Sequence, residues 1–449
     1  MNDQYAELYS SYQWLVPSQF NMAQACLHRW AENSHEGRRT AIYTEDELGH
    51  VDSWSYTRLS ETSNQLANGL LRMGVQPGDR VGIAMGQRPE AVASYMAIFS
   101  VGAMAVPLPG SLESGAIEAC LRHAQARVAL VDTLSGPDLL QAHMNYPELS
   151  QIVGLGFQHD NIIPWRTLLA RQPATFKPTL LNASRPALLV YKNPADKPLK
   201  GVLISHGALI GSLPGFVASQ NWFPSMAGPF WSPADWMSAE GLMSALLPAL
   251  YFGRPVVAAL GRFSGARALE ILDRYGVTHA YFPAHQLEQM ASEAEPATAP
   301  DMQLSLRAIA FNGAGDRNEA MYQWCERHLG IAPNIVLGTP EAPLFIGNSQ
   351  HKWPAAPGSI GRPYPGHLVT VLDPQGLPCP ADVAGELAVN RYDVNGHPDP
   401  ALFQNYWNDP DATHARFIGD WWLSGVQARV DRHGNFWYMG SCTSAIQSP

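Results

Sequence analysis

The sequence predicts an α/β protein in which two subdomains with mainly parallel sheets covered by helices are followed by a small β-barrel. The first observation is that short apolar runs alternate with segments of helical periodicity through the first three-quarters of the chain. The second is a change of composition near Trp353, where Pro and Gly begin to recur every few residues. The apolar runs include ARVALVD, ALLVYK, RPVVAAL, GVTHAYF and LRAIAFNGAG.

The clearest unit of this alternation ends at Leu108. A Pro-Gly-Asp turn leads into an apolar strand that begins at Arg80, and a second apolar strand covers Ala103–Leu108. The residues between the two strands place apolar side chains at helical spacing. This order of strand, helix and strand is typical of a parallel sheet covered by helices.

The last quarter of the chain has a different pattern. Runs such as HLVTVLD and GELAVN are alternating or fully apolar and are separated by turn residues, which favours short antiparallel strands in a small barrel. We therefore predict a first α/β subdomain over residues 1–185, a second over 186–352 and a β-barrel over 353–449.

The composition favours a globular protein and excludes several functions. Of 449 residues, 46% are hydrophobic and 15% are charged, and the net charge is −10. No basic block occurs, so nucleic acid is not an expected partner. Five dispersed cysteines without a CxxC pair predict neither disulfides nor a zinc site. We expect a cytoplasmic location, because the sequence shows no secretory leader and no apolar run that is long enough to span a membrane.

One loop between two expected strands is unusual. Residues 187–205 read ALLVYKNPADKPLKGVLIS, and a phosphate-binding loop is expected before the Lys-Gly pair. Such a loop surrounds its anion with backbone N–H groups and hydroxyls. Pro194 and Pro198 have no N–H, the loop has no Ser or Thr, and no glycine precedes Gly201. Asp196 adds a negative charge where phosphates would lie.

Segments between Tyr12 and Gly440 resemble one family in order and spacing. Together they look like the N-terminal core of AMP-forming acyl-CoA synthetases, the adenylate-forming superfamily, and especially its medium-chain acyl and acetate-activating branch. The resemblance implies two α/β subdomains and a small β-barrel, normally followed by a mobile C-terminal domain that we expect this chain to lack. The matching segments include QPGDRV, KGVLISHGAL, FWSPADWMSAEGLMSALLPALYFGRPVVA, PGSIGRPYPGH and ALFQNYWNDPDATHARFIGDWW.

The resemblance also implies a chemistry. Family members use ATP and magnesium to convert a carboxylate into an acyl-adenylate and then transfer the acyl group to coenzyme A. Their phosphate loop reads Thr-Ser-Gly-Thr-Thr-Gly-x-Pro-Lys-Gly, and only its last two residues survive here. Its lysines leave a rebuilt phosphate site open, but we favour a solvated, turn-rich loop. The aligned positions are Lys192, Asn193, Pro194, Ala195, Asp196, Lys197, Pro198, Leu199, Lys200 and Gly201.

The positions that the resemblance assigns to the nucleotide are altered as well. The aromatic that stacks on adenine is replaced by Leu337, the ribose-binding aspartate by Val426 and the phosphate-facing arginine by Ser441. Glu341 is the one candidate metal ligand, although we favour a surface or turn carboxylate there. The nucleotide-pocket equivalents are Gly313, Ala314, Leu337, Gly338, Val426 and Ser441.

The acyl side keeps more of the family pattern. An apolar, aromatic-lined cleft is what a small-ligand site needs. Simple core packing explains the same residues equally well, and we assign no catalytic residue. The acyl-pocket candidates are His206, Trp231, Asp235, Trp236 and Gly241.

We therefore expect an acyl-CoA synthetase-like pseudoenzyme that cannot adenylate carboxylates. It would bind an acyl or carboxylate small molecule, or a protein partner, in a regulatory or scaffolding role, and it would need no cofactor. The first alternative is an active carboxylate-adenylating enzyme with a rebuilt ATP site, which would use ATP, magnesium and coenzyme A. The second alternative is a pure protein-interaction subunit.

Overall fold

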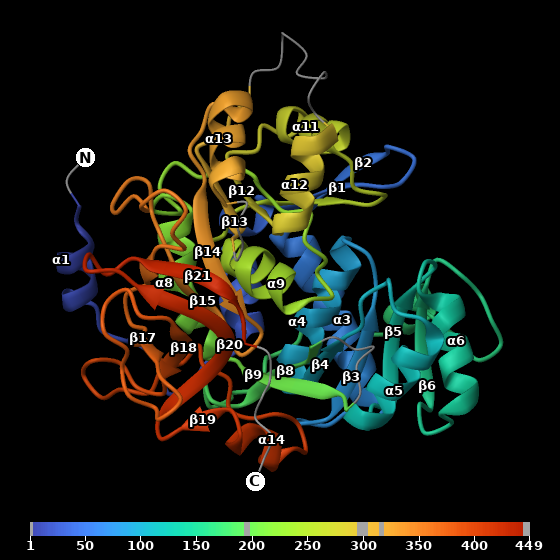
Figure 1. Ribbon diagram of the computed structural model, residues 1–449. Helices are drawn as coiled ribbons and strands as arrows, with labels where there is room; N and C mark the ends of the chain where they lie inside the picture. Colours follow the sequence, from blue (N-terminus) through green and yellow to red (C-terminus); the bar gives the residue numbers. More distant parts are fainter. Residues whose placement is uncertain (1–2, 193–197, 294–303, 314–317, 443–449) are drawn as a thin grey trace.

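Three β-sheets form the framework of the protein, and helices cover the two larger sheets (Figure 1). The computed structural model describes residues 3–192, 198–293, 304–313 and 318–442. Mainly parallel α/β sheets and a separate antiparallel sheet are what the sequence predicts, and the structure confirms this fold class.

The first sheet has seven strands. All neighbouring pairs are parallel except β8 and β9, which form an antiparallel hairpin. The order across the sheet is β7-β6-β5-β3-β4-β8-β9. Its strands are β3 (Arg80–Ala84), β4 (Met104–Pro107), β5 (Val128–Asp132), β6 (Gln151–Leu155), β7 (Ile163–Pro164), β8 (Pro186–Lys192) and β9 (Lys200–Ser205).

The second sheet has nine strands in the order β16-β15-β14-β13-β12-β10-β11-β1-β2. Its middle strands are parallel, and antiparallel strands stand at both edges. Its strands are β1 (Thr40–Glu45), β2 (Val51–Ser55), β10 (Phe230–Trp231), β11 (Val256–Ala259), β12 (His279–Phe282), β13 (Ala308–Asn312), β14 (Asn334–Thr339), β15 (Ala342–Gly347) and β16 (Arg362–Pro363).

The third sheet is antiparallel and comes from the last part of the chain. It runs β17-β18-β20-β19, and β21 also pairs with β20. Short antiparallel strands are thus confirmed where the sequence predicts a small barrel. The strands are β17 (Val369–Leu372), β18 (Gly385–Asn390), β19 (Phe417–Ile418), β20 (Trp421–Val430) and β21 (Phe436–Ser441).

The helices lie between and around the sheets (Figure 1). Those of the first half are α1 (Tyr5–Ser11), α2 (Arg29–Ala31), α3 (Tyr56–Arg72), α4 (Pro89–Val101), α5 (Ser114–Ala124), α6 (Gly136–Asn145) and α7 (Trp165–Leu169). Those of the second half are α8 (Ala208–Ser219), α9 (Ala239–Gly241), α10 (Leu247–Tyr251), α11 (Gly265–Arg274), α12 (Ala284–Glu293), α13 (Asn318–Leu329) and α14 (Pro410–His414). Short irregular helical turns are η1 (Gln24–His28), η2 (Glu36–Arg38) and η3 (Leu242–Leu246).

Helix α4 links the two large sheets in one core. It starts at Pro89, in the first turn, where a missing N–H costs nothing, and ends before Gly102, whose φ of 84° is left-handed. Every residue of α4 except Glu90 is buried. Its side chains share one hydrophobic cluster with Val81 of β3 and Tyr281 of β12. A helix that is apolar all round is buried on all sides in this way.

The sheets do not follow the predicted subdomain boundary at residue 185. β8 and β9, which come after it, complete the seven-stranded sheet, and β1 and β2, which come before it, form an edge of the nine-stranded sheet. β16 also stays in the nine-stranded sheet, although it follows the predicted start of the barrel at residue 353. The boundary at residue 185 stays a prediction, and strand pairing crosses it because such pairing is long-range: Ile42 pairs with Val256.

Candidate functional site

The hairpin of β8 and β9 carries the residues that flank the unusual loop. Tyr191 pairs with Gly201, and Lys192 pairs with Lys200. The hairpin is closely packed at Gly201, where a Cβ atom would lie 2.7 Å from Leu189 Cδ1. The expected strand and its closing Lys-Gly pair therefore belong to the seven-stranded sheet. The loop positions Asn193, Pro194, Ala195, Asp196 and Lys197 lie outside the described residues.

Lys192 forms an ion pair with Glu341. Lys192 Nζ lies 3.2 Å from Glu341 Oε1 and 3.5 Å from Oε2, and Tyr406 Oη donates a 2.8 Å hydrogen bond to Oε1. Glu341 stands in the turn between β14 and β15, as expected, but its exposed fraction is 0%, so the expectation of a surface carboxylate is wrong. The sequence does not reveal this burial, because Lys192 and Tyr406 lie 149 and 65 residues away.

The ion pair keeps Glu341 charged inside the protein. Burial alone raises the pKa of Glu341, but the Lys192 ammonium and the Tyr406 hydroxyl together hold that pKa below its ordinary value. Burial and the adjacent Glu341 carboxylate raise the pKa of Tyr406, so its hydroxyl keeps its proton and donates. The buried carboxylate is thus balanced from within the chain.

A cavity of about 310 Å³, which we call the hairpin cavity, opens beside Lys192. Strands of both large sheets contribute Lys192, Tyr281, Asn312 and Gly338, at or near their C-terminal ends. The segment 237–240, which leads into α9, forms another part of the wall. Open α/β sheets bind ligands beyond the C-terminal ends of their strands, so the position suits a ligand site.

One of the described nucleotide-pocket equivalents lines this cavity, and two others are next to lining residues in the chain. Gly338 lines it, and the preceding Leu337 is buried in the core. Gly313 directly follows Asn312, and its N–H donates a 3.0 Å hydrogen bond to the Val336 carbonyl. Ala314 lies outside the described residues.

Val426 and Ser441 lie in the antiparallel sheet. They are cross-strand partners in β20 and β21, and neither lines the hairpin cavity. The Val426 N–H donates a 3.1 Å hydrogen bond to Ser424 Oγ. The structure thus brings these two predicted residues together, but apart from Lys192 and Gly338.

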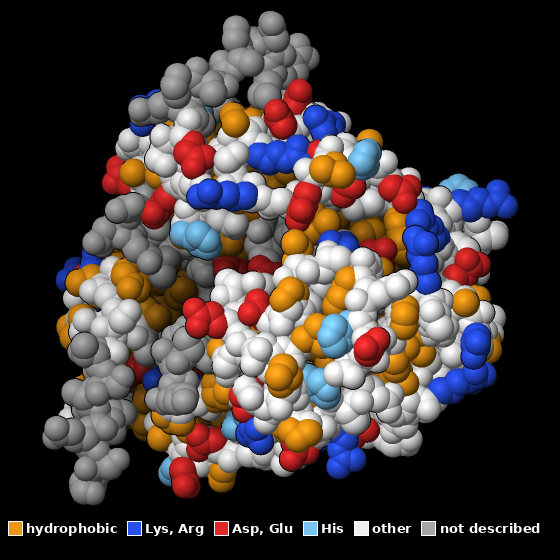
Figure 2. All heavy atoms as spheres, turned by 90° about the vertical axis from the view of Figure 1, so that its right-hand side faces the viewer, with side chains coloured by type: hydrophobic (Ala, Val, Ile, Leu, Met, Phe, Trp, Pro, Cys, Tyr) orange, Lys and Arg blue, Asp and Glu red, His pale blue; other side chains and the backbone are white. Residues whose placement is uncertain are grey.

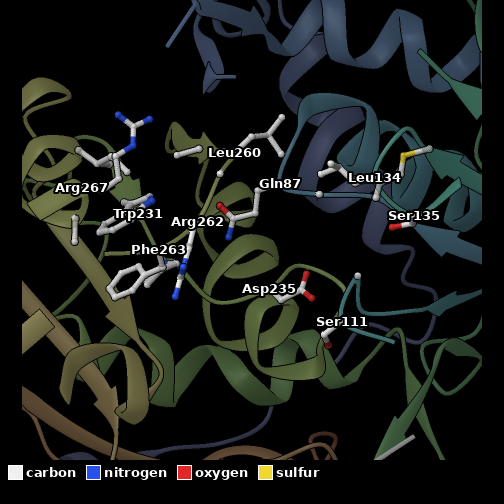
Figure 3. A pocket seen from close by; sticks show the side chains of 18 residues that line it. Gln87, Ser111, Leu134, Ser135, Trp231, Asp235, Leu260, Arg262, Phe263 and Arg267 are labelled. Atoms are coloured by element: carbon white, nitrogen blue, oxygen red, sulfur yellow. The ribbon is translucent and has the colours of Figure 1, made fainter. Parts of the chain in front are cut away.

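A second cavity, of about 340 Å³, which we call the cleft, is lined by Trp231 and Asp235 (Figure 3). Figure 3 shows Phe263 on the same side as Trp231, and Leu134 and Ser135 on the opposite side. Figure 2 shows that the surface is hollowed between an upper and a lower part of the molecule, with hydrophobic side chains in the hollow. Two of the predicted acyl-pocket residues therefore share one concave site.

Trp231 and Asp235 differ in their environment. Trp231 is buried, and its Nε1–H has no hydrogen-bond partner among the described residues. Asp235 reaches solvent through the cleft, and its Oδ1 accepts a 2.8 Å hydrogen bond from the Met237 N–H. The protein packed around its carboxylate raises the pKa of Asp235.

The other three acyl-pocket candidates line neither cavity. His206 is fully buried, its Nδ1 accepts a 3.2 Å backbone hydrogen bond, and burial lowers its pKa to about 3. The Trp236 side chain is buried, and its carbonyl accepts a 2.8 Å hydrogen bond from Tyr95 Oη. A Cβ atom at Gly241 would collide with the carbonyl oxygen of Asp235. These three residues pack the core and set the course of the chain.

Sequence reasoning missed the polar residues around the hairpin cavity: Glu240, Tyr281, Asn312 and Tyr406. Glu240 carried a signal, because it is the only charged residue in the stretch WMSAEGLMSALLPALYFG. Asn312 is the polar residue of an otherwise apolar strand, whereas Tyr281 shares its strand with His279. Tyr406 carried no signal, since its contact with Glu341 depends on the fold.

A comparison with protein families matches residues 27–396 to the family described as AMP-binding enzyme. The chain belongs to that family. This confirms the resemblance to acyl-CoA synthetases that the motifs indicate.

Relatives of this AMP-binding family member carry related names. The acyl-CoA ligase YtcI of Bacillus subtilis (strain 168), described as uncharacterized, is 27% identical, and the alignment covers 94% of this chain and 77% of that protein. An acetyl-coenzyme A synthetase of Streptomyces avermitilis is 25% identical, with 95% of this chain and 68% of that protein covered.

Two solved structures share the fold of this chain. An acyl-CoA synthetase of Brucella canis has a TM-score of 0.86 at 20% identity, over 98% of this chain and 80% of that chain. An anthranilate CoA ligase in complex with anthranoyl-AMP has a TM-score of 0.84 at 21% identity, over 95% of this chain and 79% of that chain.

The described part of the chain lacks two further features. None of its helices combines the length and the apolar character that a membrane span needs. Its His, Cys, Asp and Glu side chains form no group of three or more that could hold a metal ion. The described residues therefore offer no preformed metal centre.

Proposed function

We propose that the protein is an acyl-CoA synthetase-like pseudoenzyme that binds an acyl or carboxylate small molecule without adenylating it, in a regulatory or scaffolding role. The observation that carries the proposal is the ion pair between Lys192 and Glu341. These residues align with the first position of the family's phosphate loop and with its metal-ligating carboxylate. In this chain the ammonium of Lys192 and the carboxylate of Glu341 balance each other's charge.

The described residues do not fit the magnesium triphosphate that the family resemblance implies. Both Glu341 oxygens lie within 3.5 Å of the Lys192 ammonium, and one also accepts the Tyr406 hydrogen bond. A cation bound at Glu341 would be repelled by Lys192, by about 4 kcal/mol per unit of charge at 4 Å and an effective dielectric of about 20. Moving Lys192 away would leave a buried carboxylate without its counter-charge, which is also costly.

Three substitutions support the same proposal. Leu337 has no ring that could stack on adenine, Val426 has no acceptor for ribose hydroxyls, and Ser441 has no guanidinium for phosphate. Each missing charge-assisted hydrogen bond is worth roughly 1.5–3 kcal/mol. Together these losses lower the affinity for a nucleotide by several orders of magnitude.

The ligand-binding half of the proposal rests on the hairpin cavity. Lys192 lines it with a side chain that is 37% exposed. An ammonium has three N–H donors, and the two Glu341 oxygens use at most two of them. One donor therefore stays available for the carboxylate of a ligand in the cavity.

Titration calorimetry and a pyrophosphate assay test the proposal. We expect no binding of magnesium-ATP and no pyrophosphate release with a panel of short aliphatic, medium-chain and aromatic carboxylates, whereas at least one of these acids raises the melting temperature. An acetyl-coenzyme A synthetase provides the positive control.

The outcomes separate the three hypotheses. Micromolar binding of magnesium-ATP, or pyrophosphate release with any of the acids, would contradict the proposal and favour the active adenylating enzyme. If no acid changes the melting temperature, the pure protein-interaction subunit is favoured instead.

A further inference from the structure

The hairpin cavity has a second charged group in its wall. Among the described residues that line it, the charged ones are Lys192 and Glu240. Lys192 is balanced by Glu341, which lies behind it in the interior. Glu240 is held by an uncharged partner, because Tyr281 Oη donates a 2.7 Å hydrogen bond to Glu240 Oε1. The described cavity wall therefore has an excess of negative charge at Glu240.

Tyr281 fixes the Glu240 carboxylate in place. Tyr281 is 2% exposed and stands in strand β12, and burial and the Glu240 charge raise its pKa, so it remains a donor. The hydrogen bond uses one Glu240 oxygen and leaves the other as an acceptor at the cavity.

Asn312 adds a second acceptor to the same wall. It ends strand β13 and lines the cavity, and its Oδ1 is buried without a hydrogen-bond partner among the described residues. A buried polar atom without a partner costs free energy, and a donor on a ligand would remove that cost. Glu240 and Asn312 together favour a ligand that donates hydrogen bonds.

We propose that the ligand of the hairpin cavity is a small amino-carboxylic acid, whose ammonium group is bound by Glu240 and Asn312 and whose carboxylate is bound by Lys192. The inference rests on the proposed function and names its ligand class. A purely apolar acyl chain would displace water from Glu240 and Asn312, and it could not replace the hydrogen bonds that this water makes. An ammonium supplies both the missing donors and the counter-charge.

The test compares three benzoates that differ in one para substituent. They are para-(aminomethyl)benzoate, para-(hydroxymethyl)benzoate and para-toluate, and their binding to the full chain is measured by titration calorimetry near neutral pH. We expect the aminomethyl compound to bind at least about tenfold more tightly than para-toluate, which is what one charge-assisted hydrogen bond contributes. The hydroxymethyl compound should fall between them.

Two variants assign the preference to its residue. Glu240→Gln keeps an acceptor for Tyr281 and removes the charge, so the preference for the amine should disappear. Glu47→Gln changes an exposed glutamate in a turn, and the preference should remain. An unchanged preference in Glu240→Gln overturns the inference.

The remaining outcomes distinguish failure of this inference from failure of the proposed function. Equal or tighter binding of para-toluate overturns the amine preference and leaves the proposed function standing. Absence of binding by all three compounds overturns the inference, and the melting temperatures with the wider panel of carboxylates then decide whether the ligand-binding half of the proposal stands. Pyrophosphate release with the aminomethyl compound overturns the proposed lack of adenylation but not the amine preference.

Discussion

At the scale of single residues, the contact between Lys192 and Glu341 decides how the hairpin cavity is charged. A carboxylate with an exposed fraction of 0% stays ionised only when it is paired and hydrogen-bonded, and Lys192 and Tyr406 meet both needs. The pair also ties the hairpin of the seven-stranded sheet to the β14–β15 turn of the nine-stranded sheet. One ion pair thus links local charge to the packing of the two sheets.

Removing the ammonium should therefore destabilise the protein. In Lys192→Met, Glu341 must either stay charged without its partner or take up a proton in the interior. We expect the free energy of unfolding to fall by about 2–3 kcal/mol, which is below the cost for a fully buried pair because Lys192 is 37% exposed. Urea denaturation near neutral pH measures this change, and Lys177→Met, at an exposed lysine, should change it by less than about 0.5 kcal/mol.

The pH dependence of this loss identifies its cause. The folded pKa of Glu341 is lowered, so its contribution is complete above the unfolded value of about 4.3 and is lost as the pH falls through the lower folded pKa. In Lys192→Met, burial without the ammonium raises the pKa of Glu341, so the difference between the wild type and the variant should already shrink as the pH falls from about 7 towards the unfolded value of about 4.3. A difference that stays constant from about pH 7 to about pH 5 would assign the loss to packing rather than to the ion pair.

At the scale of elements, the sequence predicted the strands and helices well but not their partners. The strand expected from Arg80 is β3, the helix after it is α4, and the strand expected at Ala103–Leu108 is β4 at Met104–Pro107. Apolar periodicity and turn residues are local signals, and they are sufficient for such elements. Strand order depends on hydrogen bonds between distant segments, so local signals do not reveal that strands from both sides of residue 185 share each large sheet.

The turn into α9 positions Glu240 through close backbone packing. Ser238 caps the helix by accepting the Gly241 N–H at 3.0 Å, and Gly241 lies against the Asp235 carbonyl. A Cβ atom at Gly241 would collide with that oxygen, so α9 must shift. We expect Gly241→Ala to weaken binding of para-(aminomethyl)benzoate at least about tenfold, the full effect of one charge-assisted hydrogen bond.

Calorimetry of Gly241→Ala and of a matched glycine variant checks this role. Gly115 lies in α5, and a Cβ atom added there would have open space within 4 Å, so Gly115→Ala should bind as the wild type does and should be slightly more stable. Wild-type affinity in Gly241→Ala would show that α9 does not set the position of Glu240.

At the scale of the whole molecule, the family and its fold were accessible from the sequence, whereas the cavity chemistry was not. Motifs such as QPGDRV and PGSIGRPYPGH specify turns and packing, and they are local in the chain. The hairpin cavity instead combines Lys192, Glu240, Tyr281 and Asn312 from four separate elements. Glu240 stood out as a lone charge in an apolar stretch, but its partner Tyr281, 41 residues away, is set by the fold.

Buried histidines should make the whole fold sensitive to acid. His28, His206 and His279 are at most 3% exposed, and burial lowers their pKa values to about 4, 3 and 4. Unfolded histidines titrate near 6.5, so below that pH the unfolded chain binds more protons and stability falls as the pH falls. Each group contributes up to about 1.4 kcal/mol per pH unit, so the three together contribute at most about 4 kcal/mol per pH unit.

Urea unfolding at about pH 7, 6 and 5 measures this sensitivity. The first pH lies above the unfolded histidine pKa of about 6.5, and the other two lie between that value and the lowered pKa values of the folded protein. We expect the urea midpoint to fall steeply below about pH 6.5.

The variant His206→Asn keeps an acceptor for the backbone N–H that His206 Nδ1 now binds. It should lose about a third of the slope, since it removes one of three similar proton-binding groups. His433→Asn changes an exposed histidine and should leave the slope unaltered. A midpoint that stays constant over this range would mean that these histidines accept protons in the folded protein, in contradiction to their burial in the core that joins the sheets.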